Sequence, residues 1–524
     1  MRTLSGLDAG FLYIETPETP MHVGSLTIYE LPADLVDNPN PLSAFAQRAA
    51  LHFESRLMLA PLLHQRLALM PFDLGHPVWV DASDVDLSHH VQSHQLKAKR
   101  GASKMAALED FVAQLHSEPL DREKPLWQFH IIAGFAEGRI AVYSKVHHAA
   151  LDGAAGVALA NAILDLTPEG RVIDAAKSTG KKVAVRAAPS KSKLIGALFS
   201  NTLAQYAKIV RALPGAVRKV ASIATESRPE GIRSAISNAV SAGRALLAPK
   251  TPFNTQITPS RSFRSLSLSL KELKAIAAAL DASLNDVVLT LCSGALRSYL
   301  LAKKGLPAKS LIAAVPISLR DSGDLRQNNQ VTMLPASLGT DGKTPEQRLE
   351  KVRTAMNALK QTTAEFKSII PTDFPSLGAP WLVSGLAQIY GRTKIADRIS
   401  LPVNLVISNV AGPRVPLYLA GAKMVEYFPV SIIVHGLALN ITVHSYLDRL
   451  DFGLVACPDA VPDLMELVDY LNAEQDLLKR LAAKALVSGI RVPKSSPKSN
   501  QRSSPKPNPK PSAAKSRRKP KQTD

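Results

Sequence analysis

The segment HHAALDG at residues 147–153 carries the side chains of this chain that are best suited to chemistry. An imidazole with a pKa of about 6.5 can take a proton from a hydroxyl at neutral pH and return it to a leaving group. His147 and His148 are therefore candidate general bases. Asp152, four residues after His148, can orient the ring or tie the loop to a cation, and Gly153 permits close approach of the backbone.

Two other chemistries fit this segment less well. A zinc site needs a third and a fourth ligand, and His130 and Asp152 are near in sequence, but neither H-x-x-x-H nor thiolate spacing surrounds the segment. A nucleophilic triad would need a G-x-S-x-G elbow, which the chain lacks. A second tandem pair, His89 and His90, has no Asp-Gly after it, so the prediction rests on all seven residues. No metal is expected.

The flanking sequence predicts the elements that hold these side chains. The β-branched and aromatic run at 139–146 predicts a buried strand that ends at the histidines, and 154–166 has helical spacing. Further strands are predicted at 265–270, 311–319, 404–410 and 438–447, and further helices at 270–280, 284–305 and 461–486. This mixture favours α/β sandwiches of the α+β kind over a Rossmann or barrel succession.

The chain has 524 residues, of which 46% are hydrophobic and 20% charged, and this is enough for two domains with large cores. Clusters of breaking residues at 171–193 and 246–261 divide it. We predict an N-terminal domain at 1–170, a basic linker at 171–257, a C-terminal domain at 258–490 and a Lys/Pro-rich tail at 491–524. The tail has almost no large apolar side chains, so we expect it to be disordered.

The formal charge of +19 is concentrated outside the predicted domains. Residues 491–524 hold eleven Lys/Arg and one acid, residues 177–250 hold fourteen Lys/Arg and two acids, and the remainder carries −3. Residues 194–220 place apolar side chains on one helical arc and cations opposite, which is typical of a helix lying on an anionic membrane. A crossover helix packed on the body is the alternative. No specific nucleic-acid partner is expected, because basic and aromatic residues are not interleaved.

The cysteine count and the hydropathy indicate the cellular compartment. Cys292 and Cys457 are the only cysteines, so no disulfide framework is expected and a reducing setting fits best. The N-terminus has no long apolar region, and no run approaches the ~18 apolar residues of a spanning helix. We expect a cytoplasmic protein whose basic segments attach it to the inner face of the membrane or to lipid inclusions.

HHxxxDG is the signature of the CoA-dependent acyltransferase superfamily, and the rest of the chain resembles one of its families. From residue 4 to the last predicted helix, the sequence is similar to the bacterial wax ester synthase/acyl-CoA:diacylglycerol acyltransferase family. The matching segments are 4–26, the PLW motif at Pro125, Leu126 and Trp127, the motif at Asn285 and Asp286, VPISLR at 315–320, and residues 408–431 and 438–446. The resemblance implies two chloramphenicol-acetyltransferase-like domains with the site in a tunnel between them.

The resemblance implies roles for three residues of the HHxxxDG segment. His148 would be the general base that deprotonates an acceptor hydroxyl, which attacks an acyl-CoA thioester without a covalent acyl-enzyme. His147 would shape the pocket. Asp152 would be structural, and Arg320 of VPISLR is its candidate partner, because an isolated buried carboxylate is costly. Removing Asp152 would therefore damage fold and activity together.

For the other motif residues a structural interpretation stays open. Asn285 could donate a hydrogen bond near the reacting carbonyl, or it could cap a helix, and Asp286 belongs to the same motif. The PLW motif could line an acyl pocket, although core packing is favoured. Ser408 and Asn409 could bridge the two halves or form a turn. Ala411 stands where the family usually has proline in N-V-P-G-P.

The leading hypothesis is an acyl-CoA-dependent O-acyltransferase that forms triacylglycerol, wax ester or both. It would use acyl-CoA as a substrate, diacylglycerol or a fatty alcohol as acceptor, and no cofactor. One alternative is a condensation-type enzyme that uses carrier-protein thioesters. Another is a non-catalytic lipid-surface binding protein. The sequence does not specify the acceptor or the acyl chain length.

Overall fold

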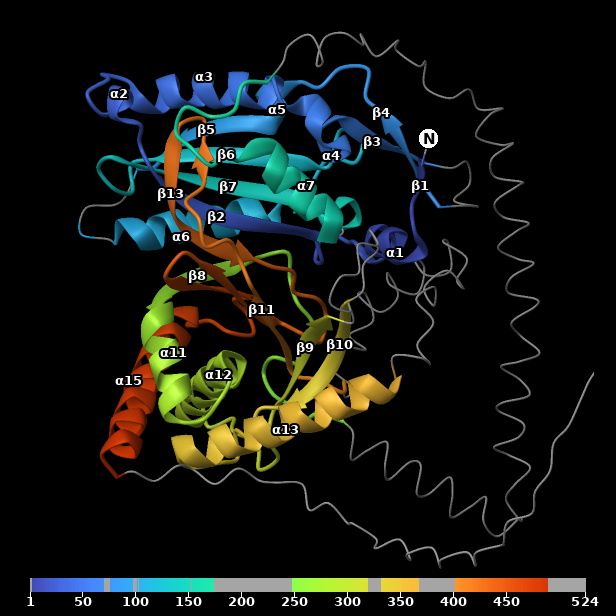
Figure 1. Ribbon diagram of the computed structural model, residues 1–524. Coiled ribbons are helices and arrows are strands. Elements are labelled where there is room, and N and C mark those ends of the chain that lie inside the picture. The colour runs from blue at the N-terminus through green and yellow to red at the C-terminus, as the bar shows by residue number, and fades with distance from the viewer. Residues whose placement is uncertain are drawn as a thin grey trace, which may run out of the picture.

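The computed structural model describes residues 2–69, 76–97, 101, 103–151, 153–173, 247–318, 331–366 and 401–488. Within these ranges lie two six-stranded mixed sheets and one three-stranded sheet. In Figure 1 the N-terminal sheet lies above and the C-terminal sheet below. The mixed α/β architecture predicted from the sequence is confirmed.

The first large sheet has the strand order β12-β13-β2-β7-β6-β5. Its strands are β2 (His22–Glu30), β5 (Val91–Gln95), β6 (Trp127–Ala133), β7 (Arg139–His147), β12 (Tyr418–Leu419) and β13 (Ala422–Val430). Helices α3 (Pro41–Glu54) and α7 (Gly153–Ile163) pack on one face, and α6 (Lys104–Ser117) packs on the other. Along β7, Val142 joins the α3–α7 cluster and Tyr143 joins the α6 cluster. Because β7 is covered on both faces, its residues 140–143 and Val146 are buried and apolar or aromatic.

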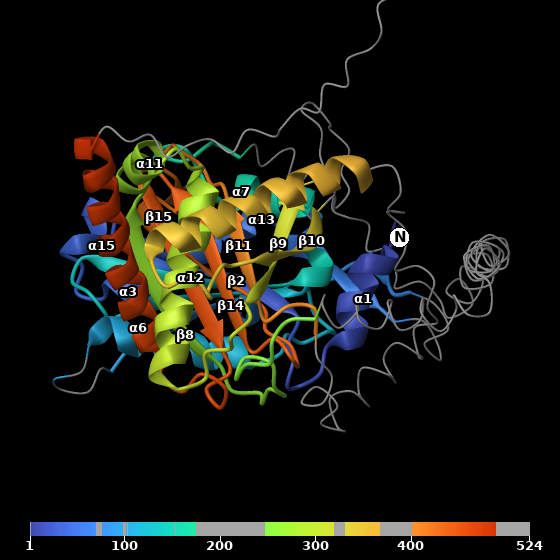
Figure 2. The same ribbon diagram turned by 90° about the horizontal axis from the view of Figure 1, so that it is seen from below.

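The second large sheet has the order β10-β9-β11-β14-β15-β8. Its strands are β8 (Ser262–Ser269), β9 (Ile312–Ser318), β10 (Val331–Ser337), β11 (Leu405–Val410), β14 (Leu439–Tyr446) and β15 (Arg449–Ala456). Its helices are α11 (Leu270–Ala279), α12 (Leu284–Ala302), α13 (Pro345–Phe366) and α15 (Leu464–Ser488). Figure 2, which views the molecule from below, shows α12 and α13 crossing this sheet. The strands and helices predicted for this half are confirmed, and the strands β10 and β15 and the helix α13 are additions.

The described fold amends the predicted domain boundaries at two places. Strands β12 and β13, from the predicted C-terminal domain, extend the N-terminal sheet, and Tyr427 on β13 pairs with Thr27 on β2. The end of the predicted linker also belongs to the second half, because Phe253 is fully buried in the core and Asn254 Nδ2 donates to the main-chain oxygen of Gly436 at 3.0 Å. A division of the sequence into contiguous domains cannot predict either feature, because strand pairing and core packing join residues that are far apart in the sequence.

Short elements complete the described fold. The three-stranded sheet contains β1 (Arg2–Thr3), β4 (Val78–Asp81) and β3 (Gln65–Ala68), and the helix α1 (Gly6–Ile14) follows β1. The remaining short helices are α2 (Ala33–Val36), η1 (Leu57–Leu59), α4 (Pro61–His64) and α5 (Leu87–His90). In the described ranges no single helix is long and apolar enough to cross a membrane; α11 and α12 pass that test only together, and they meet at 98°. The segment 194–220 and the tail at 491–524 lie outside the described residues.

Candidate active site

The histidine pair lies at the predicted transition from strand to helix. Strand β7 ends at His147, a short 3₁₀ turn η3 (His148–Ala150) follows, and α7 begins at Gly153. Three main-chain N–H groups fix this turn. That of His147 donates to the Leu126 oxygen at 3.0 Å, that of His148 donates to the Met21 oxygen at 2.8 Å, and that of Ala149 donates to His147 Nδ1 at 3.0 Å. The turn is thus tied to Leu126 and Met21, the residues directly before β6 and β2, the two strands that flank β7.

The His148 ring is half-buried and stacked on an aromatic ring. Its centroid lies 4.0 Å from that of Phe11 on α1, with 16° between the planes. Burial lowers the pKa of His148, contact with its own main chain raises it, and the neighbouring His147 lowers it. Its Nδ1 is buried and has no hydrogen-bond partner on another described residue. A neutral imidazole with Nδ1 turned inward presents Nε2 as its available base.

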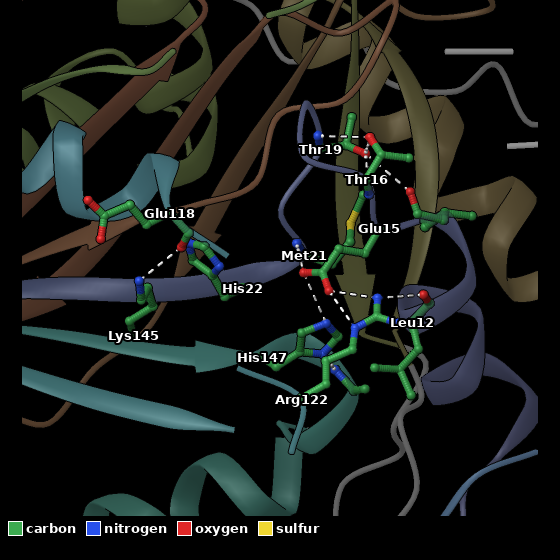
Figure 3. Close-up of polar contacts among 12 residues, drawn as sticks. Leu12, Glu15, Thr16, Thr19, Met21, His22, Glu118, Arg122, Lys145 and His147 are labelled. Atoms are coloured by element: carbon green, nitrogen blue, oxygen red, sulfur yellow. Dashed lines mark hydrogen bonds and ion pairs between the residues drawn. The ribbon is translucent and has the colours of Figure 1, made fainter. Parts of the chain in front are cut away.

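His147 faces away from this stack, toward a buried carboxylate. Its Nε2 lies 3.3 Å from Glu15 Oε1, at the end of α1. Glu15 Oε2 accepts from Arg122 Nε at 2.9 Å and from Arg122 Nη2 at 2.7 Å, and Oε1 accepts from the main-chain N–H of Met21 at 2.8 Å. Figure 3 shows these contacts converging on the one carboxylate.

These contacts fix the state of Glu15 and the orientation of His147. Burial raises the pKa of Glu15, but His147, Arg122 and the Met21 N–H together lower it to about 2. Because His147 Nδ1 accepts the N–H of Ala149, its proton belongs on Nε2, facing Glu15. Glu15 thereby positions His147, and the Nδ1 of His147 caps the η3 turn that begins at His148. Sequence reasoning missed Glu15, and its place in the matched segment 4–26 was the available signal.

The PLW motif is buried and contacts the histidine turn through its main chain. Trp127 is fully buried, donates its Nε1–H to the Leu63 oxygen at 3.1 Å, and stacks on His90 with ring centroids 4.2 Å apart. Pro125 and Leu126 are also buried. The main-chain oxygen of Leu126 accepts the N–H of His147. The motif therefore packs in the core, as the favoured interpretation has it, and does not line a pocket through Trp127.

The Asn285–Asp286 motif opens helix α12. Ser283 caps this helix, and Asp286 completes a capping box by accepting the Ser283 N–H at 2.9 Å, so the interpretation of Asn285 as the cap is wrong. Asn285 Oδ1 instead accepts from Asn409 Nδ2 at 3.2 Å. Asp286 is thus structural, and within the described part of the chain the side chain of Asn285 is bonded through its Oδ1.

Ser408 and Asn409 lie in strand β11, so the turn interpretation is wrong for both. The bridge from Asn409 to Asn285 joins β11 to α12, which both belong to the second half of the chain. This hydrogen bond lies within one half, and a bridge from Ser408 or Asn409 to the other half stays a prediction. The hydrogen bonds found among the described residues join Asn285 to Asn409 rather than to either histidine of the turn.

Two predicted partners lie outside the described residues. These are Asp152 and Arg320, so their pairing stays a prediction. The described part of the chain contains no group of three or more His, Cys, Asp or Glu side chains placed to hold a metal ion. His130, the extra ligand considered for zinc, has its Nδ1 3.1 Å from His94 Nε2.

Lys145 precedes His147 by two residues on the same face of β7 and serves the fold. Its Nζ donates to the main-chain oxygen of Leu115 at 3.0 Å, at the end of α6. It also donates to that of Glu118 at 2.9 Å (Figure 3). Burial lowers the pKa of Lys145 to about 8. Carbonyl groups at a helix C-terminus favour a cation, so the ammonium group ties α6 to the sheet.

Burial strongly lowers the pKa of five further histidines. Burial lowers the pKa of His22 well below its usual range, that of His116 and His130 to about 3, and that of His90 and His444 to about 4. Each is therefore neutral when folded and takes up a proton near pH 6.5 when unfolded.

Acidification is expected to destabilise the protein because of these histidines. Because the pKa of each of these histidines is lower in the folded than in the unfolded chain, its contribution to stability is complete above pH 6.5. This contribution is lost as the pH falls toward the folded pKa, at about 1.4 kcal/mol per histidine and pH unit. Burial raises the pKa of Asp451 to about 6 and also raises that of Glu109, which offsets part of the loss. Urea denaturation at pH 7 and pH 5.5 should show a lower midpoint at pH 5.5. Equal midpoints would contradict this burial pattern.

Comparison with known proteins identifies the family. The model for the wax ester synthase/diacylglycerol acyltransferase catalytic domain matches residues 4–288, and the model for the C-terminal domain of the same family matches residues 327–479. This chain belongs to that family. An O-acyltransferase of Acinetobacter baylyi is 34% identical over 492 residues, covering 92% of this chain and 98% of the relative. A Mycobacterium tuberculosis protein named as a diacylglycerol O-acyltransferase is 35% identical over 482 residues, covering 91% and 90%.

A solved structure from the same family has the same fold. The wax ester synthase/diacylglycerol acyltransferase from Marinobacter aquaeolei VT8 matches with a TM-score of 0.63 and 29% identity, covering 92% of this chain and all of that chain. The matched catalytic-domain model of the family includes α1, the His147–His148 turn and Asn285. The Glu15 carboxylate and the Phe11 ring therefore lie inside the family's catalytic domain, together with the histidines they contact.

Proposed function

We propose that this protein transfers a fatty acyl group from acyl-CoA to the hydroxyl group of diacylglycerol, of a long-chain alcohol, or of both. The observation that carries the proposal is His148, a neutral and half-buried imidazole on a braced turn, in a chain of the wax ester synthase/diacylglycerol acyltransferase family. The named activities of the Acinetobacter and Marinobacter relatives support the same reaction class.

The reaction is proposed to proceed by direct attack. His148 Nε2 takes the acceptor's hydroxyl proton as the oxygen bonds to the thioester carbonyl carbon, and a tetrahedral oxyanion forms. The carbon–sulfur bond then breaks, and the imidazolium returns its proton to the CoA sulfur. The products are one ester and one free CoA, without an acylated protein. Acyl-CoA is a substrate here, and the scheme requires no metal or cofactor.

The neighbouring residues are proposed to support this step. Glu15 and His147 hold the turn that carries the base, and Asp152 is proposed to brace it through Arg320. Asn285 is proposed to donate an amide N–H to the oxyanion, since its Oδ1 is occupied by Asn409. A preorganised donor of this kind is worth roughly 10²- to 10³-fold in rate.

A direct assay tests the proposed function. Purified full-length protein is given labelled palmitoyl-CoA with diacylglycerol, with hexadecanol, or with neither. Labelled triacylglycerol or wax ester in the first two reactions is the expected result, and their ratio measures the acceptor preference. Ester formation from a palmitoyl carrier protein but not from palmitoyl-CoA would contradict the proposal and favour a condensation-type enzyme.

The basic segments are proposed to attach the enzyme to an anionic lipid surface on the cytoplasmic side, where its acceptors partition. The charge of residues 177–250 and 491–524 and the amphipathic pattern at 194–220 support this proposal. Deleting 194–220 should weaken cosedimentation with vesicles that contain phosphatidylglycerol. Vesicle binding that is unchanged by the deletion would contradict the role of that segment.

A further inference from the structure

Helix α1 presents an aromatic ring to the proposed base. The Phe11 and His148 rings overlap at 4.0 Å, close to parallel at 16°. The helix is anchored on both sides of Phe11, because Ser5 caps it and the Leu12 oxygen accepts from Arg122 Nη2 at 2.8 Å. Leu12 is also buried in the cluster that contains Ala149 of the turn. Phe11 is therefore held in place by α1, the helix that Glu15 directly follows.

Two features of the surroundings of His148 oppose a positive charge on its ring. These are burial and the neighbouring His147, whereas contact with its own main chain favours the charged ring. On the elements packed against the turn, the Glu15 carboxylate is occupied by His147, Arg122 and the Met21 N–H. The face of a phenyl ring carries negative charge density and attracts a cation within about 6 Å. Together with that main-chain contact, the Phe11 ring is therefore a described contact that favours the imidazolium.

We propose that Phe11 is a positioning residue for the reaction: its ring holds the His148 imidazole in one plane and stabilises the imidazolium that forms when the acceptor loses its proton. The proposal rests on the proposed role of His148. It predicts that the charge on the face of the residue 11 ring, and not merely its volume, governs the rate of acyl transfer.

Fluorinated phenylalanines at position 11 separate charge from shape. The 4-fluoro, 3,5-difluoro and 3,4,5-trifluoro forms progressively remove negative charge from the ring face with little change in size. The single-turnover rate of ester formation is expected to fall stepwise, to about threefold to tenfold below wild type for the trifluoro form. The acid limb of the pH–rate profile should move to lower pH in the same order, because the imidazolium loses stabilisation.

The same substitutions at Phe111 supply a matched control. The Phe111 ring contacts His94, a histidine outside the turn, at a centroid distance of 5.0 Å. Rates and pH profiles of the Phe111 series should equal those of the wild type. Phe11→Leu, which keeps an apolar side chain without a ring, is expected to lose at least about tenfold in kcat with KM little changed.

Two results would overturn the proposal. One is a fluorinated series at Phe11 with constant rate and a constant acid limb. The other is a Phe11→Leu variant whose lost activity is fully explained by a lost folded fraction. If His148→Ala abolishes activity in either case, the proposed function stands and only the role of Phe11 fails. If His148→Ala stays fully active, the proposed function itself fails.

Discussion

Replacing His148 with alanine is expected to lower kcat for ester formation by about a thousandfold. A positioned general base contributes roughly 10²- to 10⁴-fold to the rate. The other residues of the η3 turn, Ala149 and Ala150, have no side-chain group that could replace the imidazole. The turn itself should survive, because the N–H of residue 148 still donates to the Met21 oxygen and His147 still accepts from Ala149. The loss should therefore be in kcat and not in folding. The measurement is initial rates with palmitoyl-CoA and diacylglycerol, alongside thermal melting.

The second tandem pair provides the control for this substitution. His89 is half-buried, and its Nε2 lies 3.3 Å from Gln128 Nε2, away from the turn. His89→Ala should keep kcat within about twofold of wild type, since a surface substitution away from the site costs little. A His148→Ala variant as active as His89→Ala would refute the role of His148 as base.

Replacing Glu15 with glutamine is expected to weaken both folding and catalysis. The carboxylate is surrounded by donors: two Arg122 N–H groups, the Met21 N–H and His147 Nε2–H. An amide NH₂ in the same place must face at least one donor, and a broken buried pair costs about 3 kcal/mol. Misplacing the turn should then lower kcat by about 10- to 100-fold, because a shift of about 1 Å in a catalytic group can cost that much.

The pH dependence gives this prediction a second measurement. The pKa of Glu15 is lowered to about 2 in the folded chain, so its stabilisation is complete above about pH 4.5 and is lost as the pH falls toward 2. Glu15→Gln should therefore lose stability equally at pH 6 and pH 8. Glu30→Gln is the matched control, since Glu30 is exposed at the far end of β2. Equal urea midpoints for the two variants would contradict the account of Glu15.

The catalytic segment could be predicted from the sequence because its evidence is local. The apolar run of β7, the helical spacing of α7 and the seven residues between them are contiguous. The strand-to-helix placement follows from that short stretch alone. Helices α11 and α12 were predictable for the same reason, since Ser269 and Ser283 cap them directly before an apolar helical pattern.

The supports of the site depend on contacts between distant residues. Phe11 and Glu15 meet the turn only because α1 packs on it, over more than 130 residues of sequence. Nothing in the local pattern around Glu15 indicates that His147 will be its partner. Strand β13 is similar, because it pairs with β2, a strand far away in the sequence, as in the pair Tyr427 and Thr27.

The most direct test of the central claim is one single-turnover experiment with the wild-type protein and His148→Ala. Excess enzyme, labelled palmitoyl-CoA and diacylglycerol are mixed and quenched, and ester, free CoA thiol and the intact protein mass are measured together. We predict that one ester appears for each CoA released, at the same rate, without an acyl adduct on the protein, and that His148→Ala slows both products about a thousandfold. An acylated protein that precedes the ester, or equal rates for the two proteins, would contradict direct transfer with His148 as base.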